Sequence, residues 1–376
     1  MTTQMVELFA GIGGFRLAGE ALGIETIWAN DIDQKAAQIY QQQFKGGTFV
    51  QGDIKKCLHQ IPNHQLLTAG FPCQPFSSAG KKKGFHDPRG TLFEVVVQIL
   101  QTHSPSFFVL ENVKRLLSMD NGQHFATILN SLSSLDYLIE WRLLNAKHFC
   151  LPQHRERVII IGSKNSVPKS FLATSPDFCT LSDNQLTQIA GHHRWINITK
   201  HDQKFPNWGL SYHHQMIGFQ LTHFYDAQNS VLLTDIVQKQ VDSRFDLTQE
   251  TQARLKNSQR VNKYYNGVEI LYNQKGGARM GYTLFGINGV APTLTSSTSR
   301  HYERYRIGNQ YRRLTPVEYA RIQGFPDNHC ERLPIYDQYA LYGNAVPPPM
   351  VKWVIPRLIN DLSVDFHRLN NQMELF

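Results

Sequence analysis

The sequence predicts an α/β protein with a mostly parallel sheet covered by helices on both faces, followed by a smaller, loop-rich domain. Across residues 1–165, short apolar runs alternate with longer amphipathic ones, a pattern typical of buried parallel strands joined by helices. Beyond about residue 176 the periodicity weakens, and glycines, histidines and side-chain amides become frequent. The 376 residues are enough for one large domain and a smaller one.

Each expected element follows from a local pattern. Apolar runs predict strands at Met5–Phe9, Thr26–Ala29, Leu66–Gly70, Phe107–Leu110, Leu138–Leu144 and Val158–Gly162. Helical patterns occur at Lys35–Phe44, Leu92–Thr102 and, near the end of the chain, Val351–Leu362. Parallel sheets bind ligands at the carboxyl ends of their strands, so the residues that follow each strand are the candidates for function.

Composition excludes several classes of protein. The five cysteines are odd in number and lack Cys-x-x-Cys spacing, which argues against a disulfide framework or a zinc site and favours a reducing cytoplasm. No apolar run approaches the roughly 20 residues that cross a bilayer, and the N-terminus does not resemble a signal peptide. We therefore expect a cytoplasmic protein with no membrane and no metal partner. The net charge of +8 suits a polyanionic partner without proving one.

The first strand ends in a glycine-rich turn, Phe9-Ala10-Gly11-Ile12-Gly13-Gly14. Such glycines allow the backbone to approach a ligand at the start of a helix. Asp31 follows the second strand, where a carboxylate can accept both ribose hydroxyls of a nucleoside. The full dinucleotide pattern needs a glycine where Arg16 stands, which disfavours a nicotinamide oxidoreductase and leaves another adenosine-bearing cofactor. A glycine turn beside an exposed acid, without a ligand, is the alternative.

A thiol follows the strand at Leu66–Gly70, within the run Gly-Phe-Pro-Cys73-Gln-Pro-Phe-Ser77. A free cysteine is usually a small buried hydrophobe. Cys73, however, lies in a loop stiffened by two prolines and precedes a basic stretch that includes Lys81 and Arg89. Nearby positive charge favours the reactive thiolate and can also meet phosphates. We interpret Cys73 as a nucleophile.

Two further strands border polar residues. Glu111 follows the apolar run Phe107–Leu110, where a carboxyl group is positioned for proton donation; helix capping is the alternative. Arg155 and Arg157 precede the strand at Val158–Gly162. Alternate residues of an extended segment share a face, so the pair is expected to hold an anion or a polarised carbonyl, unless both merely pair with Glu156.

In this order, the motifs resemble those of the DNA (cytosine-5) methyltransferases, above all the single-chain enzymes of bacterial restriction–modification systems. The resemblance covers nearly the whole chain and leaves only about residues 176–275 unmatched. It rests on FAGIGG, Asp31, Gly52-Asp53-Ile54, GFPCQPFS, Glu111-Asn112-Val113, QHRER, RRLTPVEYARIQGFP and YGNAVP. Asp31 stands where many relatives have glutamate, and Ala79 where serine is frequent.

The resemblance implies a Rossmann-like methyltransferase fold and an enzyme that transfers a methyl group from S-adenosylmethionine to carbon 5 of cytosine. The cytosine would be flipped out of a specific short double-stranded DNA site and held in a covalent Cys73–C6 adduct. The implied catalytic residues are Cys73, Glu111, Arg155 and Arg157. The implied cofactor-binding residues are Phe9, Gly11, Ile12, Gly14, Asp31, Ile32, Asp53, Ile54, Leu92 and Asn344.

The same resemblance implies a division of the chain. Residues 1–175 and 342–376 would bind the cofactor and perform the chemistry, 176–310 would recognise the target, and 311–341 would connect the two. The implied DNA-binding residues are Ser77, Lys81, Arg89, Thr293, Leu294, Arg300 and Arg304. We expect a monomeric, protective methylase whose functional partner is a cognate restriction endonuclease.

Three alternatives stay open at this point: an RNA-directed member of the same superfamily that acts on transfer RNA, a catalytically silent DNA-binding protein, and a nicotinamide oxidoreductase. The Thr293-Leu294 dipeptide and the long middle region disfavour the first of these. The full set of Cys73, Glu111 and Arg155 disfavours the second, since a pure binder does not need them.

Overall fold

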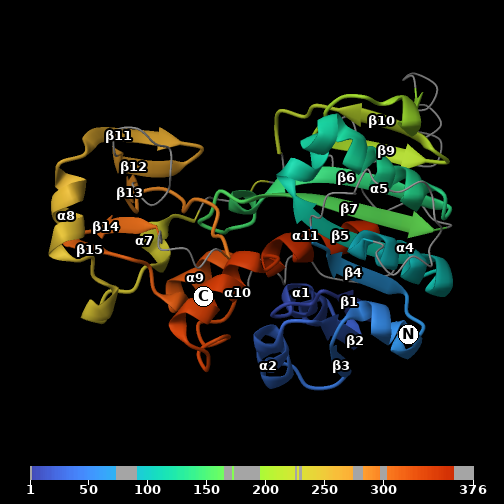
Figure 1. Cartoon of the computed structure of the whole chain (residues 1–376), viewed down its shortest axis with the longest axis horizontal. Helices are drawn as coiled ribbons and strands as arrows, with labels where there is room; N and C mark the ends of the chain where they lie inside the picture. Colours follow the sequence, from blue (N-terminus) through green and yellow to red (C-terminus); the bar gives the residue numbers. More distant parts are fainter. Residues whose placement is uncertain are drawn as a thin grey trace.

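The computed structural model describes residues 2–72, 91–164, 172, 195–224, 227, 231–273, 283–296 and 303–359. In these ranges the chain forms two parts, one built on a ten-stranded sheet and the other on a five-stranded sheet (Figure 1). None of the helices in these ranges has the length and apolar character that a membrane span needs. The predicted α/β fold with a second, smaller part is confirmed.

One half of the large sheet is parallel, with strand order β3-β2-β1-β4-β5. Its strands are β1 (Gln4–Leu8), β2 (Glu25–Asp31), β3 (Thr48–Gln51), β4 (Leu66–Gly70) and β5 (Phe107–Val113). The helices between and after them are α1 (Gly14–Ala21), α2 (Gln34–Gln43), α3 (Ile54–Cys57), α4 (Leu92–His103) and α5 (Gln123–Ser133). The carboxyl ends of these five strands therefore lie along one edge, as the sequence analysis requires.

The other half of the sheet is antiparallel, in the order β7-β6-β9-β10-β8, so the sheet as a whole is mixed. These strands are β6 (Tyr137–Asn145), β7 (Glu156–Lys164), β8 (Ile196–Asn197), β9 (Trp208–Tyr212) and β10 (Gln215–Phe219). Residues 196–219 thus extend the large sheet, and the expected domain boundary near residue 176 is wrong for them. Strands β8, β9 and β10 have only two to five residues each, which hides their pairing at the level of sequence.

Helices cover both faces of the large sheet. In β5, Phe108 and Leu110 pack under α4 and α5, while the intervening Val109 packs on the other face with α1 and α11 (Pro348–Leu358). This alternation is what a strand with two buried faces requires. The predicted C-terminal return to the first domain is confirmed, because Val351 and Val354 of α11 share a core with Phe15 of α1.

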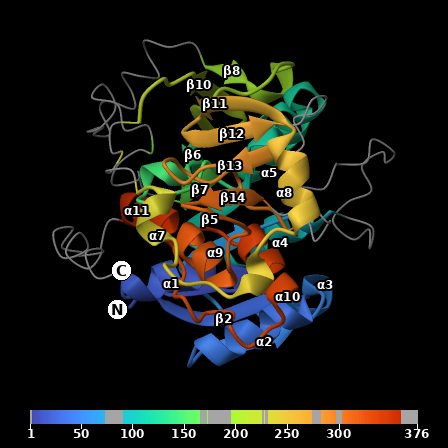
Figure 2. The same cartoon turned by 90° about the vertical axis from the view of Figure 1, so that its left-hand side faces the viewer.

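The smaller part is more regular than expected. Its sheet runs β11-β12-β13-β14-β15 and is flanked by two helices (Figure 2). The elements are α7 (Leu233–Ile236), α8 (Gln249–Lys256), β11 (Gln259–Tyr265), β12 (Val268–Asn273), β13 (Thr283–Phe285), β14 (Arg304–Ile307) and β15 (Gln310–Arg312). Short 3-10 turns connect elements in both parts: η1 (Leu58–Gln60), η2 (Lys114–Gly122), η3 (Ala146–His148), η4 (Ile198–Lys200) and η5 (Ser243–Phe245).

Two helices lie between the parts, α9 (Pro316–Gln323) and α10 (Ile335–Asn344) (Figure 1). A capping box forms at the start of α9, where Thr315 and Glu318 exchange hydrogen bonds and Pro316 opens the helix. Glu318 also accepts two hydrogen bonds from Arg312 of β15, at 2.6 and 2.8 Å, and both side chains are almost fully buried. This ion pair ties the small sheet to α9.

Candidate active site

A cavity of about 430 Å³ opens at the carboxyl ends of the parallel strands. All ten residues expected to bind a cofactor line it, and they come from the ends of β1, β2 and β3, the start of α4 and the end of α10. Glu111 and Arg157 line the same cavity, as do Phe71 and Pro72. The structure therefore brings the residues expected to bind the cofactor and two of the expected catalytic residues to one cavity.

The glycine-rich turn has the shape that only glycine allows. Gly11 and Gly13 have φ angles of 54° and 83°, in the left-handed region. A Cβ on Gly13 would lie 2.2 Å from the Phe44 ring, and one on Gly14 would lie 2.2 Å from the carbonyl oxygen of Val346. The turn consequently brings the start of α1 against residue 346 and closes one wall of the cavity.

Asp31 is held in a fixed orientation at the end of β2. Its Oδ2 accepts a hydrogen bond from the Gly11 N–H at 2.7 Å, and its Oδ1 accepts one from the Asp33 N–H at 2.8 Å. Burial raises the pKa of Asp31, and the two backbone donors oppose that shift. Each oxygen keeps a lone pair, so the group can accept two further hydrogen bonds. Beside it, Ile32 is 70% exposed, an apolar surface on the cavity wall that suits a flat ring.

A buried acid that sequence reasoning missed lies behind the turn. Glu7 of β1 is fully buried, accepts a hydrogen bond from the Tyr40 hydroxyl at 2.7 Å, and accepts backbone hydrogen bonds from Phe15 and Arg16. Burial raises its pKa to about 8. Because a side chain of the protein already occupies the N-terminus of α1, a pyrophosphate cannot bind there. The sequence signal for this group is that an acid, Glu7, interrupts the apolar run Met5–Phe9.

Glu111 and Arg157 face each other across neighbouring strands β5 and β7. Arg157 Nε lies 2.8 Å from Glu111 Oε1, and both side chains are nearly buried. The adjacent Asn112 donates from Nδ2 to the carbonyl oxygen of Phe71 at 2.9 Å. Asn112 therefore fixes the backbone that leads to Pro72 on the cavity wall. Cys73, Ser77, Lys81 and Arg89 lie outside the described residues.

Arg155 does not lie with Arg157. It is 1% exposed and does not line the cavity; its Nη1 donates to the Leu294 carbonyl, and its Nη2 donates to the carbonyls of Gly343 and Ala345. Arg155 and Arg157 do not share a face as expected, because β7 begins at Glu156 and Arg155 precedes the regular strand. In this geometry three carbonyls occupy its guanidinium, so the structure does not favour the expected contact of Arg155 with a substrate, which stays a prediction.

A family model described as C-5 cytosine-specific DNA methylase matches residues 3–360. The chain belongs to this family. It is an enzyme of the DNA (cytosine-5) methyltransferase type, as the sequence motifs predicted.

Known members of this family match along almost their full length. The Type II methyltransferase M.HaeII of Haemophilus aegyptius is 30% identical, over 99% of this chain and 98% of its own. The Type II methyltransferase M.NgoBI of Neisseria gonorrhoeae is 32% identical, over 93% of this chain and 90% of its own. Among solved structures, the S. pombe Dnmt2 methyltransferase superposes with a TM-score of 0.62 at 18% identity, covering 96% of this chain and 100% of that one. That likeness shows the fold alone.

Two of the residues expected to read DNA, Thr293 and Leu294, lie at the junction between the two parts. Leu294 is fully buried, and the Thr293 hydroxyl donates to the carbonyl oxygen of His154 at 2.7 Å. Both residues join the two parts of this methyltransferase, so neither presents a free side chain to a groove. Arg304 lies half-buried on β14, and Arg300 lies outside the described residues.

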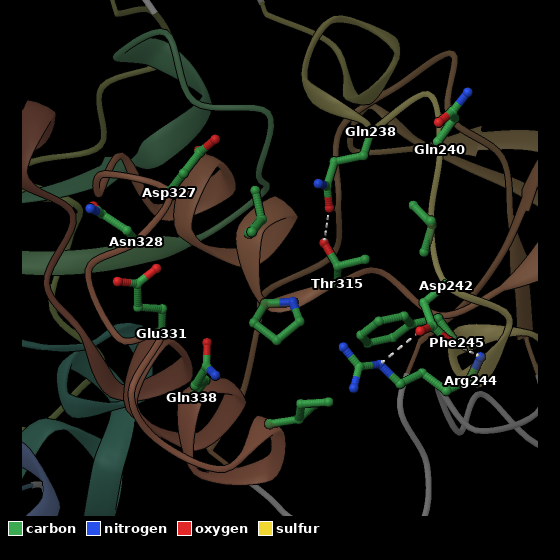
Figure 3. Close-up of a pocket in the computed structure, with 14 residues that line it drawn as sticks. Gln238, Gln240, Asp242, Arg244, Phe245, Thr315, Asp327, Asn328, Glu331 and Gln338 are labelled. Carbon is green, nitrogen blue, oxygen red and sulfur yellow. Dashed lines mark hydrogen bonds and ion pairs between the residues drawn. The ribbon is translucent and has the colours of Figure 1, made fainter.

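A second cavity, of about 390 Å³, lies between the loop at residues 238–245 and helices α9 and α10 (Figure 3). Its polar side chains largely pair with protein groups: Thr315 donates to Gln238, and Asp327 pairs with Arg321. None of the expected site residues lines it. Across the part of the chain that the structure describes, no group of three or more His, Cys, Asp or Glu side chains has a metal-binding arrangement.

Proposed function

We propose that this methyltransferase transfers a methyl group from S-adenosylmethionine to carbon 5 of a cytosine flipped out of a specific short site in double-stranded DNA. The observation that carries the proposal is the single cavity at the strand ends. Asp31 and Ile32 form the wall that suits a nucleoside. Glu111, Arg157 and the Phe71-Pro72 segment, which precedes Cys73, form the other wall. One cavity thus accommodates both a nucleoside cofactor and a pyrimidine ring.

The cavity fits S-adenosylmethionine, which supplies an electrophilic methyl group when bound. The two free lone pairs of Asp31 match the two ribose hydroxyls, and the exposed Ile32 side chain offers an apolar surface to the adenine. Asp53 and Ile54 at the start of α3 extend the same wall. The backbone of Gly11 and Gly14 and the side chain of Asn344 surround the remainder of the molecule.

Carbon 5 of cytosine is a poor nucleophile, and a covalent step activates it. The Cys73 thiolate adds to carbon 6, forming the S–C6 bond and shifting electron density onto N3 and O2. Glu111, in its protonated form, would donate to N3, which leaves carbon 5 nucleophilic. Carbon 5 would then take the methyl group that bound S-adenosylmethionine supplies, and S-adenosylhomocysteine would leave. Loss of the carbon 5 proton to a base expels the thiolate and breaks the S–C6 bond.

Arg157 is the arginine that we assign to the substrate side of this reaction. Its Nε lies 2.8 Å from Oε1 of Glu111, while Oε2 lies toward Gly70. In this position the guanidinium orients the carboxyl group and can also donate to O2 of the ring, where negative charge develops. Arg155, which was expected to share this role with Arg157, donates to three backbone carbonyls instead.

The target must leave the duplex to reach these groups, as methyltransferases of bases in general require. The smaller part, together with α9 and α10, is the proposed recognition region. On its edge strand β11, Arg260, Lys263, Tyr264 and Tyr265 are all exposed, and no described carboxylate forms an ion pair with either cation. Basic and aromatic side chains mixed in this way suit contacts with phosphates and bases.

The relatives named Type II methyltransferases support a protective role in a restriction–modification system. In that role the enzyme acts as a monomer in the cytoplasm, and its functional partner is an endonuclease with the same target.

The test is bisulfite sequencing of DNA from a methylation-free bacterial host that expresses the chain, with Cys73→Ser as the matched control. We expect protected cytosines at one short sequence, and none with the variant. Protection with Cys73→Ser, or conversion of every cytosine with the active chain, contradicts the proposal. Bisulfite sequencing of transfer RNA from the same cells tests the RNA-directed alternative.

A further inference from the structure

The two parts of the molecule meet along a short backbone ladder. The Ala291 N–H donates to the Pro152 carbonyl at 2.7 Å, and the His154 N–H donates to the Ala291 carbonyl at 2.8 Å. Gln153 continues the ladder, because its Oε1 accepts from the Leu294 N–H at 3.0 Å. Residues 152–155 of the catalytic part and 291–294 of the smaller part therefore form one structural unit.

Arg155 lies at the end of this ladder and joins a third segment to it. Its contact with Leu294 O is 2.9 Å long, and its contacts with Gly343 O and Ala345 O are 2.9 and 3.0 Å long. Gly343 and Ala345 lie at the C-terminus of α10, where helical carbonyls lack intrahelical partners and the helix dipole favours a cation. The buried positive charge is therefore stabilised by backbone carbonyls, and no described carboxylate forms an ion pair with it.

The segment at the end of α10 belongs to the cofactor cavity, since Gly343, Asn344 and Ala345 line it. It also touches the smaller part directly. A Cβ on Gly343 would lie 2.3 Å from the carbonyl carbon of Thr295 and 2.6 Å from the Ser296 nitrogen. Because the two backbones are in contact, neither segment can move without the other.

A second buried side chain reinforces the same junction. Gln153 donates from Nε2 to Gln323 Oε1 at 3.0 Å, and Gln323 in turn donates to the Tyr342 carbonyl. Both glutamines are fully buried. The last turn of α10 is thus held from two sides, by Arg155 and through Gln153.

From this network we infer that Arg155 is a positioning residue that couples the cofactor cavity to target recognition, and that it does not touch the cytosine. The inference rests on the proposed function. It states that one guanidinium sets both the end of α10, where Asn344 meets the cofactor, and the segment at residues 293–296 of the recognition part. Replacing it changes cofactor affinity and site discrimination together.

The experiment compares Arg155→Lys with Arg157→Lys in the full-length protein. Calorimetry with S-adenosylmethionine and with S-adenosylhomocysteine measures cofactor affinity without turnover. Bisulfite sequencing of methylated plasmid measures the ratio of target sites to near-matches, and steady-state kinetics at saturating cofactor separate kcat from KM.

For Arg155→Lys we expect about tenfold weaker cofactor binding, the effect of leaving buried carbonyls without a donor, together with increased methylation at near-match sites. The kcat at saturating cofactor and cognate DNA should stay within a few-fold of the wild-type value. For Arg157→Lys we expect the opposite pattern, a large fall in kcat with unchanged cofactor affinity. The inference is overturned if Arg155→Lys lowers kcat while cofactor affinity and site choice are unaltered.

Gly343→Ala is a second, independent variant at the same junction and keeps the inference testable if Arg155→Lys does not fold. Its Cβ pushes residues 295–296 away from α10, so we expect weaker cofactor binding and relaxed site choice in this variant as well. Normal affinity and normal site choice in a folded Gly343→Ala protein would contradict the coupling. If the wild-type chain methylates no DNA, the proposed function fails, and the calorimetric result still decides whether Arg155 acts on the cofactor cavity.

Discussion

Arg157 Nε lies 2.8 Å from Glu111 Oε1, inside the cavity formed by the parallel strand ends. Glu111 lies near the end of β5, and Arg157 pairs with Val113 of the same strand from the neighbouring β7. Sheet register therefore sets the contact between the two side chains. The arrangement places a carboxyl group and a fixed cation together at one end of the site.

Replacing Glu111 by glutamine keeps its shape and removes the acidic proton that the proposed mechanism gives to N3. We expect kcat to fall by about 10²–10⁴-fold, the usual contribution of a positioned general acid, with cofactor affinity unchanged. Single-turnover methylation of a duplex target measures this. The exposed Glu25→Gln variant is the control and should retain full activity. An active Glu111→Gln enzyme would remove Glu111 from the chemistry.

Asp31→Ala should weaken S-adenosylmethionine binding by about 1–3 kcal/mol, because ribose hydroxyls lose their acceptors on binding. The change also removes the acceptor of the Gly11 and Asp33 N–H groups, which both donate to the carboxylate in the wild type. Calorimetry gives the affinity directly. Asp242→Ala, at the second cavity, should bind the cofactor normally. Equal affinities for the two variants would place the cofactor elsewhere.

The sequence predicted the strand ends well because the apolar runs and glycine turns that mark them are local features. For that reason, all ten residues expected to bind the cofactor line the cavity. The positions of Arg155 and Leu294 could not be predicted, because the two residues bond to each other and no local pattern records a contact across 139 residues. β8 to β10 were missed because the pairing of β9 with β6, which joins all three strands to the large sheet, is set by tertiary packing and not by periodicity.

The burial of Glu7 makes stability depend on pH. Its pKa is raised from 4.5 to about 8, so its contribution to stability is complete below pH 4.5 and is lost as the pH rises through 8. Glu7→Gln stays neutral throughout. We therefore expect the variant to gain stability relative to the wild type between pH 4.5 and about 8, by at most about 1.4 kcal/mol per pH unit, and to gain no more above that range. Urea unfolding across this range measures the difference, and Glu25→Gln should show none. If the difference in the free energy of unfolding between Glu7→Gln and the wild type does not change with pH, Glu7 ionises normally.

Strand β11 supplies a test of the DNA surface. Lys263→Gln should weaken binding to all duplexes and reduce the salt dependence of binding, as the loss of one phosphate contact does. Tyr265, which is 65% exposed, lies at the tip of the β11–β12 hairpin, one residue before Asn266, whose side chain contacts His154 of the catalytic part. Tyr265→Ala should lower affinity for the target site more than for random DNA.

Fluorescence anisotropy over a range of salt concentrations separates these two effects. The control is Tyr212→Ala, an exposed tyrosine of β9 in the large sheet, which should bind as the wild type does. Wild-type binding by both β11 variants would show that the DNA lies on another face.

The central claim is that Cys73 forms a covalent bond to carbon 6 of the target cytosine. A duplex carrying 5-fluorocytosine at the target tests it, because fluorine cannot leave as the carbon 5 proton does, so the S–C6 bond persists after methyl transfer. Incubation with S-adenosylmethionine, digestion and mass spectrometry locate the adduct. We predict one DNA adduct on the peptide that contains Cys73, and none with Cys73→Ser. An adduct on another residue, or no adduct from an enzyme that fully methylates the unmodified duplex, would contradict the account.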